Sequence, residues 1–188
     1  GNVLDGLGTG GGTGGAIELI GPMESCTVVG NAIHDSDGYG VKLEGGTAGE
    51  CMYNIVTGNT ITAPDLGGIY VRGAEYTVVQ GNSIINAGAG TAAIYLQAPG
   101  TTTANGTLVQ GNIVGGTGHV YAISLAGENV AVFGNTFVAG SSGTYTVTDP
   151  TRRYILGNND AESPKVYTAI RTAADGDTTP TVGGARRL

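Results

Sequence analysis

The hydrophobic and polar positions of this chain repeat in one short pattern along most of its length. At the centre of each copy is a Gly-Asn pair, and a Val or Ile stands two residues before each of these glycines. In five of the six copies an Ile, Val or Phe stands three residues after the glycine. The pairs are Gly30-Asn31, Gly58-Asn59, Gly81-Asn82, Gly111-Asn112, Gly134-Asn135 and Gly157-Asn158. Their spacing of 23 to 30 residues indicates a stack of similar structural units.

A third apolar segment follows 11 to 13 residues after each of the first five glycines. In these segments inward and outward positions alternate, and an earlier copy, Ile17-Glu18-Leu19, precedes the first pair. The segments are Val41-Lys42-Leu43, Ile69-Tyr70-Val71, Ile94-Tyr95-Leu96, Ile123-Ser124-Leu125 and Tyr145-Thr146-Val147. A period of two predicts β-strands. Each repeat therefore offers three short strands separated by turns, and none can bury its apolar side chains alone.

Stacking the repeats as rungs of a coil solves this burial problem. Equivalent positions would lie ~4.8 Å apart, and the inward Val, Ile and Leu side chains would form continuous columns. Parallel crossovers are almost always right-handed. We therefore predict an all-β fold, a right-handed single-stranded parallel β-helix of about six rungs over residues 16–158. The Asn of each pair is predicted at a corner, where it tolerates a left-handed backbone and its amide can bond the next rung.

The two ends of the chain depart from the repeat. Residues 1–15 are rich in glycine and are predicted to be a linker or an entry into the first rung. Because the chain begins at Gly1 rather than Met, we expect further residues upstream. Residues 159–188 are predicted to be an exit or cap segment, with a short strand over 165–170 followed by the sequence DGDTTPTV at 175–182. Repeat arrays need such caps at both ends.

The repeat resembles the right-handed parallel β-helix of pectate lyases, other polysaccharide lyases, glycoside hydrolases, mannuronan epimerases and bacteriophage tailspikes. The segment 175–182 is similar to sequences that follow the β-helix in phage tail and tailspike-like proteins, so the chain looks most like a tailspike or tail-fibre β-helix domain. The resemblance covers residues 16–158. It implies the fold, whereas one scaffold of this kind carries many activities or none.

The outward residues of the third segments predict a candidate site. One column contains Glu18, Lys42, Tyr70, Tyr95, Ser124 and Thr146, and its neighbour contains Ile20, Glu44, Arg72, Gln97, Ala126 and Thr148. Tyrosine rings give a sugar a flat apolar platform with a polar edge. Two long loops, near residues 44–54 and 97–107, leave the same corner two rungs apart and would wall a notch at Tyr70 and Arg72. We expect Tyr70, Tyr95, Gln97 and Glu18 to contact substrate there.

Two interpretations of this notch are open, a catalytic one and a structural one. The resemblance to β-helix lyases implies that Lys42 and Arg72 act as base and acid beside Glu44. A base, however, needs a lowered pKa, and Glu18 beside Lys42 would raise it. The favoured interpretation is a ladder of ion pairs, Glu18 with Lys42 and Glu44 with Arg72, each worth ~0.2–1 kcal/mol if exposed.

A second set of carboxylates, away from the notch, is a weaker candidate for a catalytic site. A glycosidase needs two carboxyl groups about 5–5.5 Å or 6.5–9.5 Å apart, for which Asp35, Asp37 and Asp65 are the candidates. Asp is also favoured in turns for its backbone hydrogen bonds, and this explanation is preferred here. His34 follows an inward Ile and is expected to point to solvent. No metal or cofactor motif is present, and we expect no cofactor.

Composition and charge limit the kinds of partner that we expect this protein to bind. Residues 1–150 contain two cations against eleven acids, and the whole chain has a net charge of −7. Nucleic acid is excluded, because phosphate binding needs clustered cations. No apolar run is long enough to cross a bilayer, so membrane insertion is not expected. Glycine makes up 36 of the 188 residues, which disfavours helices. Cys26 and Cys51 either remain two buried thiols or form one bridge between neighbouring rungs.

These observations lead to a ranked set of functions. The first is a tailspike- or fibre-like structural domain of a virion, or an extracellular one, that recognises a surface polysaccharide or host glycan. It would be a homotrimer, in contact with other virion proteins. The alternatives are a polysaccharide lyase or glycoside hydrolase acting on an acidic polysaccharide, and a purely structural spike.

Overall fold

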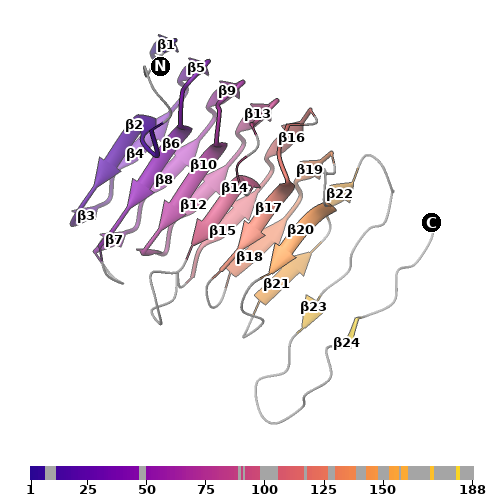
Figure 1. The fold of residues 1–188 in the computed structure, drawn as a ribbon. Coiled ribbons are helices and arrows are strands. Elements are labelled where there is room, and N and C mark those ends of the chain that lie inside the picture. The colour runs from indigo at the N-terminus through magenta and orange to yellow at the C-terminus, as the bar shows by residue number, and fades with distance from the viewer. Residues whose placement is uncertain are drawn as a thin grey trace.

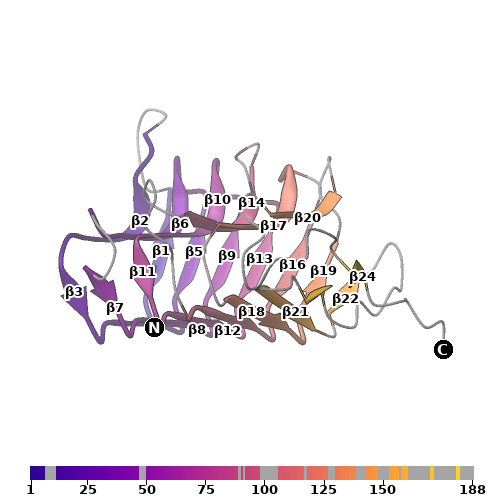
Figure 2. The same ribbon diagram turned by 90° about the horizontal axis from the view of Figure 1, so that it is seen from below.

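The computed structural model describes residues 1–6, 12–46, 50–88, 90, 92–97, 106–116, 118–126, 130–138, 143–147, 153–156, 158–160, 170–171 and 181–182. Beyond Val138 it describes the backbone only, except at Asn158. The described chain is a parallel β-solenoid, whose strands stack rung upon rung along one axis (Figures 1 and 2). No helix long and apolar enough to span a bilayer occurs among the described residues.

Three long sheets wind around one core. Sheet 1 consists of β2 (Gly15–Ile20), β6 (Tyr39–Glu44), β10 (Gly67–Arg72), β14 (Ala92–Gln97), β17 (Tyr121–Leu125) and β20 (Gly143–Val147). Sheet 2 consists of β4 (Thr27–Val29), β8 (Ile55–Thr57), β12 (Val78–Gln80), β15 (Leu108–Gln110), β18 (Val130–Phe133) and β21 (Arg153–Leu156). Sheet 3 consists of β1 (Val3–Asp5), β5 (Ala32–His34), β9 (Thr60–Thr62), β13 (Ser83–Ile85), β16 (Ile113–Gly115), β19 (Thr136–Phe137) and β22 (Asn159–Asp160).

Shorter strands complete the described structure. β3 (Met23–Glu24), β7 (Cys51–Met52) and β11 (Ala74–Glu75) form a small parallel sheet between sheets 1 and 2. Near the C-terminus β23 (Ile170–Arg171) and β24 (Thr181–Val182) pair antiparallel. The strand predicted over 165–170 lies outside the described residues except for its last member.

The predicted inward columns are confirmed. Each column is in parallel register from rung to rung, and its side chains are at most 5% exposed. They are Val28, Val56, Val79, Val109 and Val132 on sheet 2, and Ile33, Ile61, Ile84, Val114 and Phe137 on sheet 3. Sheet 1 adds Val41, Leu43, Ile69, Val71, Ile94, Leu96, Ile123 and Leu125. Burial of these side chains, each worth about 1.5–3 kcal/mol, stabilises the coil.

The predicted count of about six rungs is not matched by the part described with its side chains. From β2 to β17, the last strand of sheet 1 with described side chains, the chain makes about four full turns. Six Gly-Asn pairs span five turns, and the fifth, between the pairs at 134–135 and 157–158, lies mostly beyond Val138, where side chains are described only at Asn158. Strands β20, β21 and β22 continue the pairing through their backbones.

The predicted asparagine column is confirmed, but the left-handed backbone conformation at the corner belongs to a different residue than predicted. Each side-chain amide donates to the Oδ1 of the next Asn at 2.8–3.2 Å, in the order Asn2, Asn31, Asn59, Asn82, Asn112, Asn135 and Asn158. The left-handed residue at this corner is the glycine, as at Gly81 with φ 62°, and not the Asn. Glycine adopts this conformation without the Cβ clash, so the Asn is free to keep an inward amide.

Candidate functional site

Sheet 1 places the candidate residues in register on its outer face. Glu18 pairs with Lys42, and Lys42 with Tyr70, across neighbouring strands. One position along the same face, Glu44 pairs with Arg72. Tyr95 and Gln97 continue the two columns on β14, and Ser124 follows Tyr95 on β17. Parallel pairing with a two-residue period gives this arrangement, as the repeat predicts.

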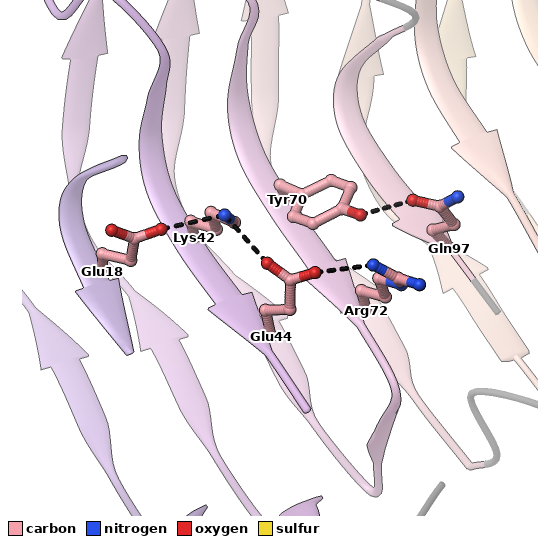
Figure 3. Close-up of polar contacts among 6 residues, drawn as sticks. All are labelled: Glu18, Lys42, Glu44, Tyr70, Arg72 and Gln97. Atoms are coloured by element: carbon pink, nitrogen blue, oxygen red, sulfur yellow. Dashed lines mark hydrogen bonds and ion pairs between the residues drawn. The ribbon is translucent and has the colours of Figure 1, made fainter. Parts of the chain in front are cut away.

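Four charged side chains form one continuous row across three strands (Figure 3). Lys42 Nζ lies 2.9 Å from Glu18 Oε1 and 2.8 Å from Glu44 Oε2, and Arg72 Nη1 lies 2.7 Å from Glu44 Oε1. The two predicted pairs are therefore present, and the Lys42–Glu44 contact along β6 joins them. The row carries two positive and two negative charges, so its charges compensate one another.

The face is more buried than the sequence predicts. Lys42 is 8% exposed and Tyr70 is 6% exposed. The ring of Tyr39 stacks on Tyr70 with centroids 4.6 Å apart, and Tyr95 meets Tyr70 edge-on at 5.4 Å. Tyr70 is consequently not the open sugar platform that we expected, because other rings cover it. Tyr39 and Tyr95 are half-buried and are the rings that remain accessible.

These side chains line a cavity of about 240 Å³. Its walls are Thr13, Tyr39, Lys42, Glu44, Tyr70, Arg72 and Gln97. This volume is below the ~300–1,000 Å³ of pockets for drug-sized molecules, so it suits one ring of a larger ligand. Thr13 and Tyr39 are not among the residues predicted from the sequence. The two long loops expected to wall the notch include residues 47–49 and 98–105, which lie outside the described residues.

Hydrogen bonds fix the protonation of the site. Tyr70 donates its hydroxyl proton to Gln97 Oε1 (Figure 3). Burial, with Glu44 nearby, raises the pKa of Tyr70 to about 12. Burial alone would lower the pKa of Lys42, but hydrogen bonds to Glu44 and Glu18 outweigh it, so the pKa is raised. Both groups are protonated at neutral pH, and neither can accept a proton as a general base.

The same contacts make stability depend on acid pH through Glu44. The hydrogen bond from Lys42 lowers its pKa; burial opposes this shift, and Arg72 reinforces it. A lowered folded pKa adds stability above the unfolded pKa, near 4.3, that is lost as pH falls through the folded value. We expect urea unfolding to show a loss of stability below about pH 4.3 that Glu44→Gln reduces. Asp65→Asn removes an exposed carboxylate away from the row and is the control for the change of charge. An unchanged profile in Glu44→Gln would contradict the assignment.

The other acidic candidates do not converge on this cavity. Asp35 is exposed and left-handed, with φ 57°, and Asp65 is exposed while its N–H donates to Ser36 O at 2.8 Å. His34 points outward, as expected, with Nδ1 3.1 Å from Asp5 Oδ1. Within the described ranges no group of three or more His, Cys, Asp or Glu side chains could hold a metal.

The two cysteines are free thiols rather than a bridge. Cys51 is fully buried and accepts a hydrogen bond from Asn54 Nδ2 at 3.1 Å. Burial raises the pKa of Cys51 to about 11. Cys26 is only half-buried, so the expectation of two buried thiols holds for one of them.

The chain is a parallel β-solenoid with a polar cavity on one sheet face. This class of fold is consistent with proteins that bind polysaccharides or act on them. The chain belongs to the right-handed β-helix family, whose model, "Right handed beta helix region", matches residues 11–161. No curated protein and no solved structure matches the chain significantly.

Proposed function

We propose that this chain is a polysaccharide-recognition module that holds one sugar ring in the sheet 1 cavity and does not cleave it. The observation that carries the proposal is the cavity itself, with an aromatic wall and a compensated row of charges. Sugars present hydroxyl groups and a weakly apolar ring face, which suit polar side chains beside tyrosines.

Free donors in the cavity match sugar hydroxyls. The Oε1 of Gln97 accepts from Tyr70, and within the described residues its amide nitrogen has no partner. The Arg72 side chain is 38% exposed, and its Nη1 is held by Glu44. The guanidinium is therefore oriented by the protein while its outer edge faces solvent. Groups fixed in this way bind at a lower entropic cost than mobile ones.

Binding is favoured over cleavage because the base of the lyase alternative, Lys42, is held as a cation, and the two carboxylates beside it are themselves ion-paired. A lyase step at Lys42 would require its neutral amine, yet two carboxylates hold it as a cation. The lyase and hydrolase alternatives, with Lys42, Arg72 and Glu44 as catalytic groups, therefore remain as outcomes of the test below.

The wider setting is also a proposal. A virion spike or fibre, or another extracellular assembly, with three copies of the chain and contacts to other virion proteins, would present the cavity to a surface polysaccharide or host glycan. The likeness of segment 175–182 to tailspike-like sequences supports this setting.

Glycan binding tests the proposal. An array of bacterial surface oligosaccharides should give a hit, and calorimetry with that glycan should show at least tenfold weaker binding for Arg72→Ala and Gln97→Ala. Arg72→Lys, which keeps the charge but not the planar donors, should lie between. Asp65→Asn is the matched surface control.

Product assays complete this test. Neither unsaturated uronates nor new reducing ends should appear from the bound glycan. Product formation that Lys42→Met abolishes would replace the proposal with the lyase, and the absence of any array hit would overturn it.

A further inference from the structure

The small sheet of β3, β7 and β11 forms the corner between sheets 1 and 2 (Figure 2). Two tyrosines, Tyr53 and Tyr76, directly follow β7 and β11 at this corner. Their rings stack with centroids 5.3 Å apart and planes 12° from parallel. Tyr53 is 50% exposed and Tyr76 is 46% exposed, so the pair remains open to solvent. Aromatic rings that present an apolar face and a polar edge are enriched at binding surfaces.

Both tyrosines have a left-handed backbone, with φ of 57° at Tyr53 and 50° at Tyr76. A bulky side chain is unfavourable in this conformation, which glycine adopts freely. The next residue in the same column is Gly106, with φ 68°, so glycine fits the corner. Strained residues of this kind cluster at ligand-binding and active sites. The two rings therefore indicate a binding role rather than a need of the corner itself.

Small residues border the pair on both sides along the solenoid axis. A Cβ added at Gly106 would lie 2.6 Å from Cδ1 of Tyr76, so this ring fills the space beside the glycine. The Tyr53 ring in turn stacks on Tyr76. On the rung before, the corresponding residue is Ser25, which is exposed. In the described part of the chain, the side of Tyr53 away from Tyr76 is therefore open, above Ser25.

Two carboxylates lie beside the rings. Glu24 on β3 and Glu75 on β11 are both in register with Met52 on β7. Cys51 is buried, so the residue after it faces outward together with its two register partners. Within the described ranges neither carboxylate makes an ion pair or a side-chain hydrogen bond. An ionised carboxylate only accepts hydrogen bonds, so the pair is flanked by free acceptors.

A neutral sugar ring matches this combination of groups. Its C–H face stacks on an aromatic ring, and its hydroxyl groups donate hydrogen bonds to carboxylates. An acidic sugar fits less well, because Glu24 and Glu75 would repel it on a chain with a net charge of −7. A protein contact is the alternative, and Ile55, 39% exposed on the adjoining sheet 2, would extend its apolar area. The free carboxylates beside the rings favour the sugar.

We propose that the Tyr53–Tyr76 pair is a second sugar-binding site, which stacks a neutral unit of the same glycan that the sheet 1 cavity holds. This second site rests on the proposed function, whose cavity it extends around the corner. Arg72 of the cavity and Tyr76 are four residues apart on one rung, so their Cα atoms lie at most ~14 Å apart. An oligosaccharide of several units reaches both sites and lies across the solenoid axis. Two linked contacts bind more tightly than either alone, because the second one forms within the complex.

The length of the glycan tests the second site. The probes are the oligosaccharide that binds on the array and shorter fragments of it, titrated by calorimetry. The wild-type chain should bind the longest fragment at least about tenfold more tightly than the shortest one that binds. Tyr53→Leu, which keeps apolar bulk but removes the flat ring, should lose this gain. Arg72→Ala should weaken the binding of every fragment.

Two further variants are the controls. Tyr53→Phe keeps the ring and should retain the gain to within about threefold. Phe133→Ala removes a 37% exposed aromatic ring from the end of β18 on sheet 2 and should bind every fragment as the wild type does. Circular dichroism should show that all variants are folded.

The outcomes separate the second site from the cavity. An unchanged gain in Tyr53→Leu would overturn the second site and favour a protein contact at the pair. If Arg72→Ala weakens binding and Tyr53→Leu does not, the proposed function stands without the second site. If only Tyr53→Leu weakens binding, the pair holds the glycan and the cavity does not. An array without any hit would overturn both.

Discussion

Asn82→Ala is expected to lower the free energy of unfolding by about 3 kcal/mol or more. Asn82 donates to Val56 O at 2.9 Å and Asn112 Oδ1 at 3.0 Å, and it accepts from the backbone and side chain of Asn59. It is 1% exposed, so water cannot replace these bonds. Each buried group left without a partner costs about 1–3 kcal/mol.

Urea unfolding at one fixed protein concentration measures this loss, because self-association would add its own stability. Gln80→Ala removes a similar amide two residues earlier, from an exposed position, and should change stability by less than about 0.5 kcal/mol. Equal effects of the two substitutions would show that the amide column contributes nothing specific.

Lys42→Met is expected to lower stability by about 2–3 kcal/mol at neutral pH. This value lies between the ~0–1 kcal/mol of an exposed ion pair and the ~3–5 kcal/mol of a broken buried one. The substitution keeps most of the apolar stem but leaves Glu18 without a cation and Glu44 with Arg72 alone, on neighbouring strands. The loss should therefore shrink as pH falls and the carboxylates become protonated.

A double variant separates charge from packing. Lys42→Met combined with Glu18→Gln removes the carboxylate that has lost its cation and keeps the Glu44–Arg72 pair, so it should be more stable than Lys42→Met alone. Chemical unfolding of the single and double variants between pH 4 and pH 7 gives the comparison. A loss that is the same at all pH values in Lys42→Met would attribute the effect to packing and contradict the ion-pair row.

The fold could be predicted because every repeat carries the same local information. Val or Ile before Gly-Asn, and an apolar residue after it, fix which side chains face inward. A slip of one residue would expose the whole column, so the register follows from the pattern. The same pattern predicts Lys42 beside Glu18 and Arg72 beside Glu44, and both pairs are present.

The cavity could not be predicted fully, because the period of two breaks at the start of the sheet 1 strands. Gly40 and Val41 are both buried, so two consecutive residues face inward. A Cβ at Gly40 would overlap the Ile61 side chain, which shows that this position faces the core. Strict alternation, counted back from Val41, therefore predicts that Tyr39 faces inward. In the structure its ring lies on the outer face and covers Tyr70. Glycine at position 40 is the one signal that could have indicated the break.

The burial of the outer face of sheet 1 could not be predicted from the pattern either. Alternation tells which face a side chain takes, but not whether other side chains then cover that face. Tyr70 takes the predicted side and still becomes buried, because Tyr39 and Tyr95 are long enough to reach it. Similarly, Thr13 reaches the cavity from a glycine-rich segment that has no periodic signal.

The asparagine column has one direction, since each amide of the column from Asn2 to Asn135 donates to the side-chain oxygen of the next Asn along the chain. Any two successive rungs therefore meet through the same donor and the same acceptor, whatever the length of the loops between them. A whole rung can be duplicated or deleted and the column closes again without an orphaned amide. A part of a rung cannot, because it would break the column. The length of this protein is thus free to evolve in whole-rung steps, so that gene duplication within the repeat can lengthen or shorten the rod while its core chemistry stays the same.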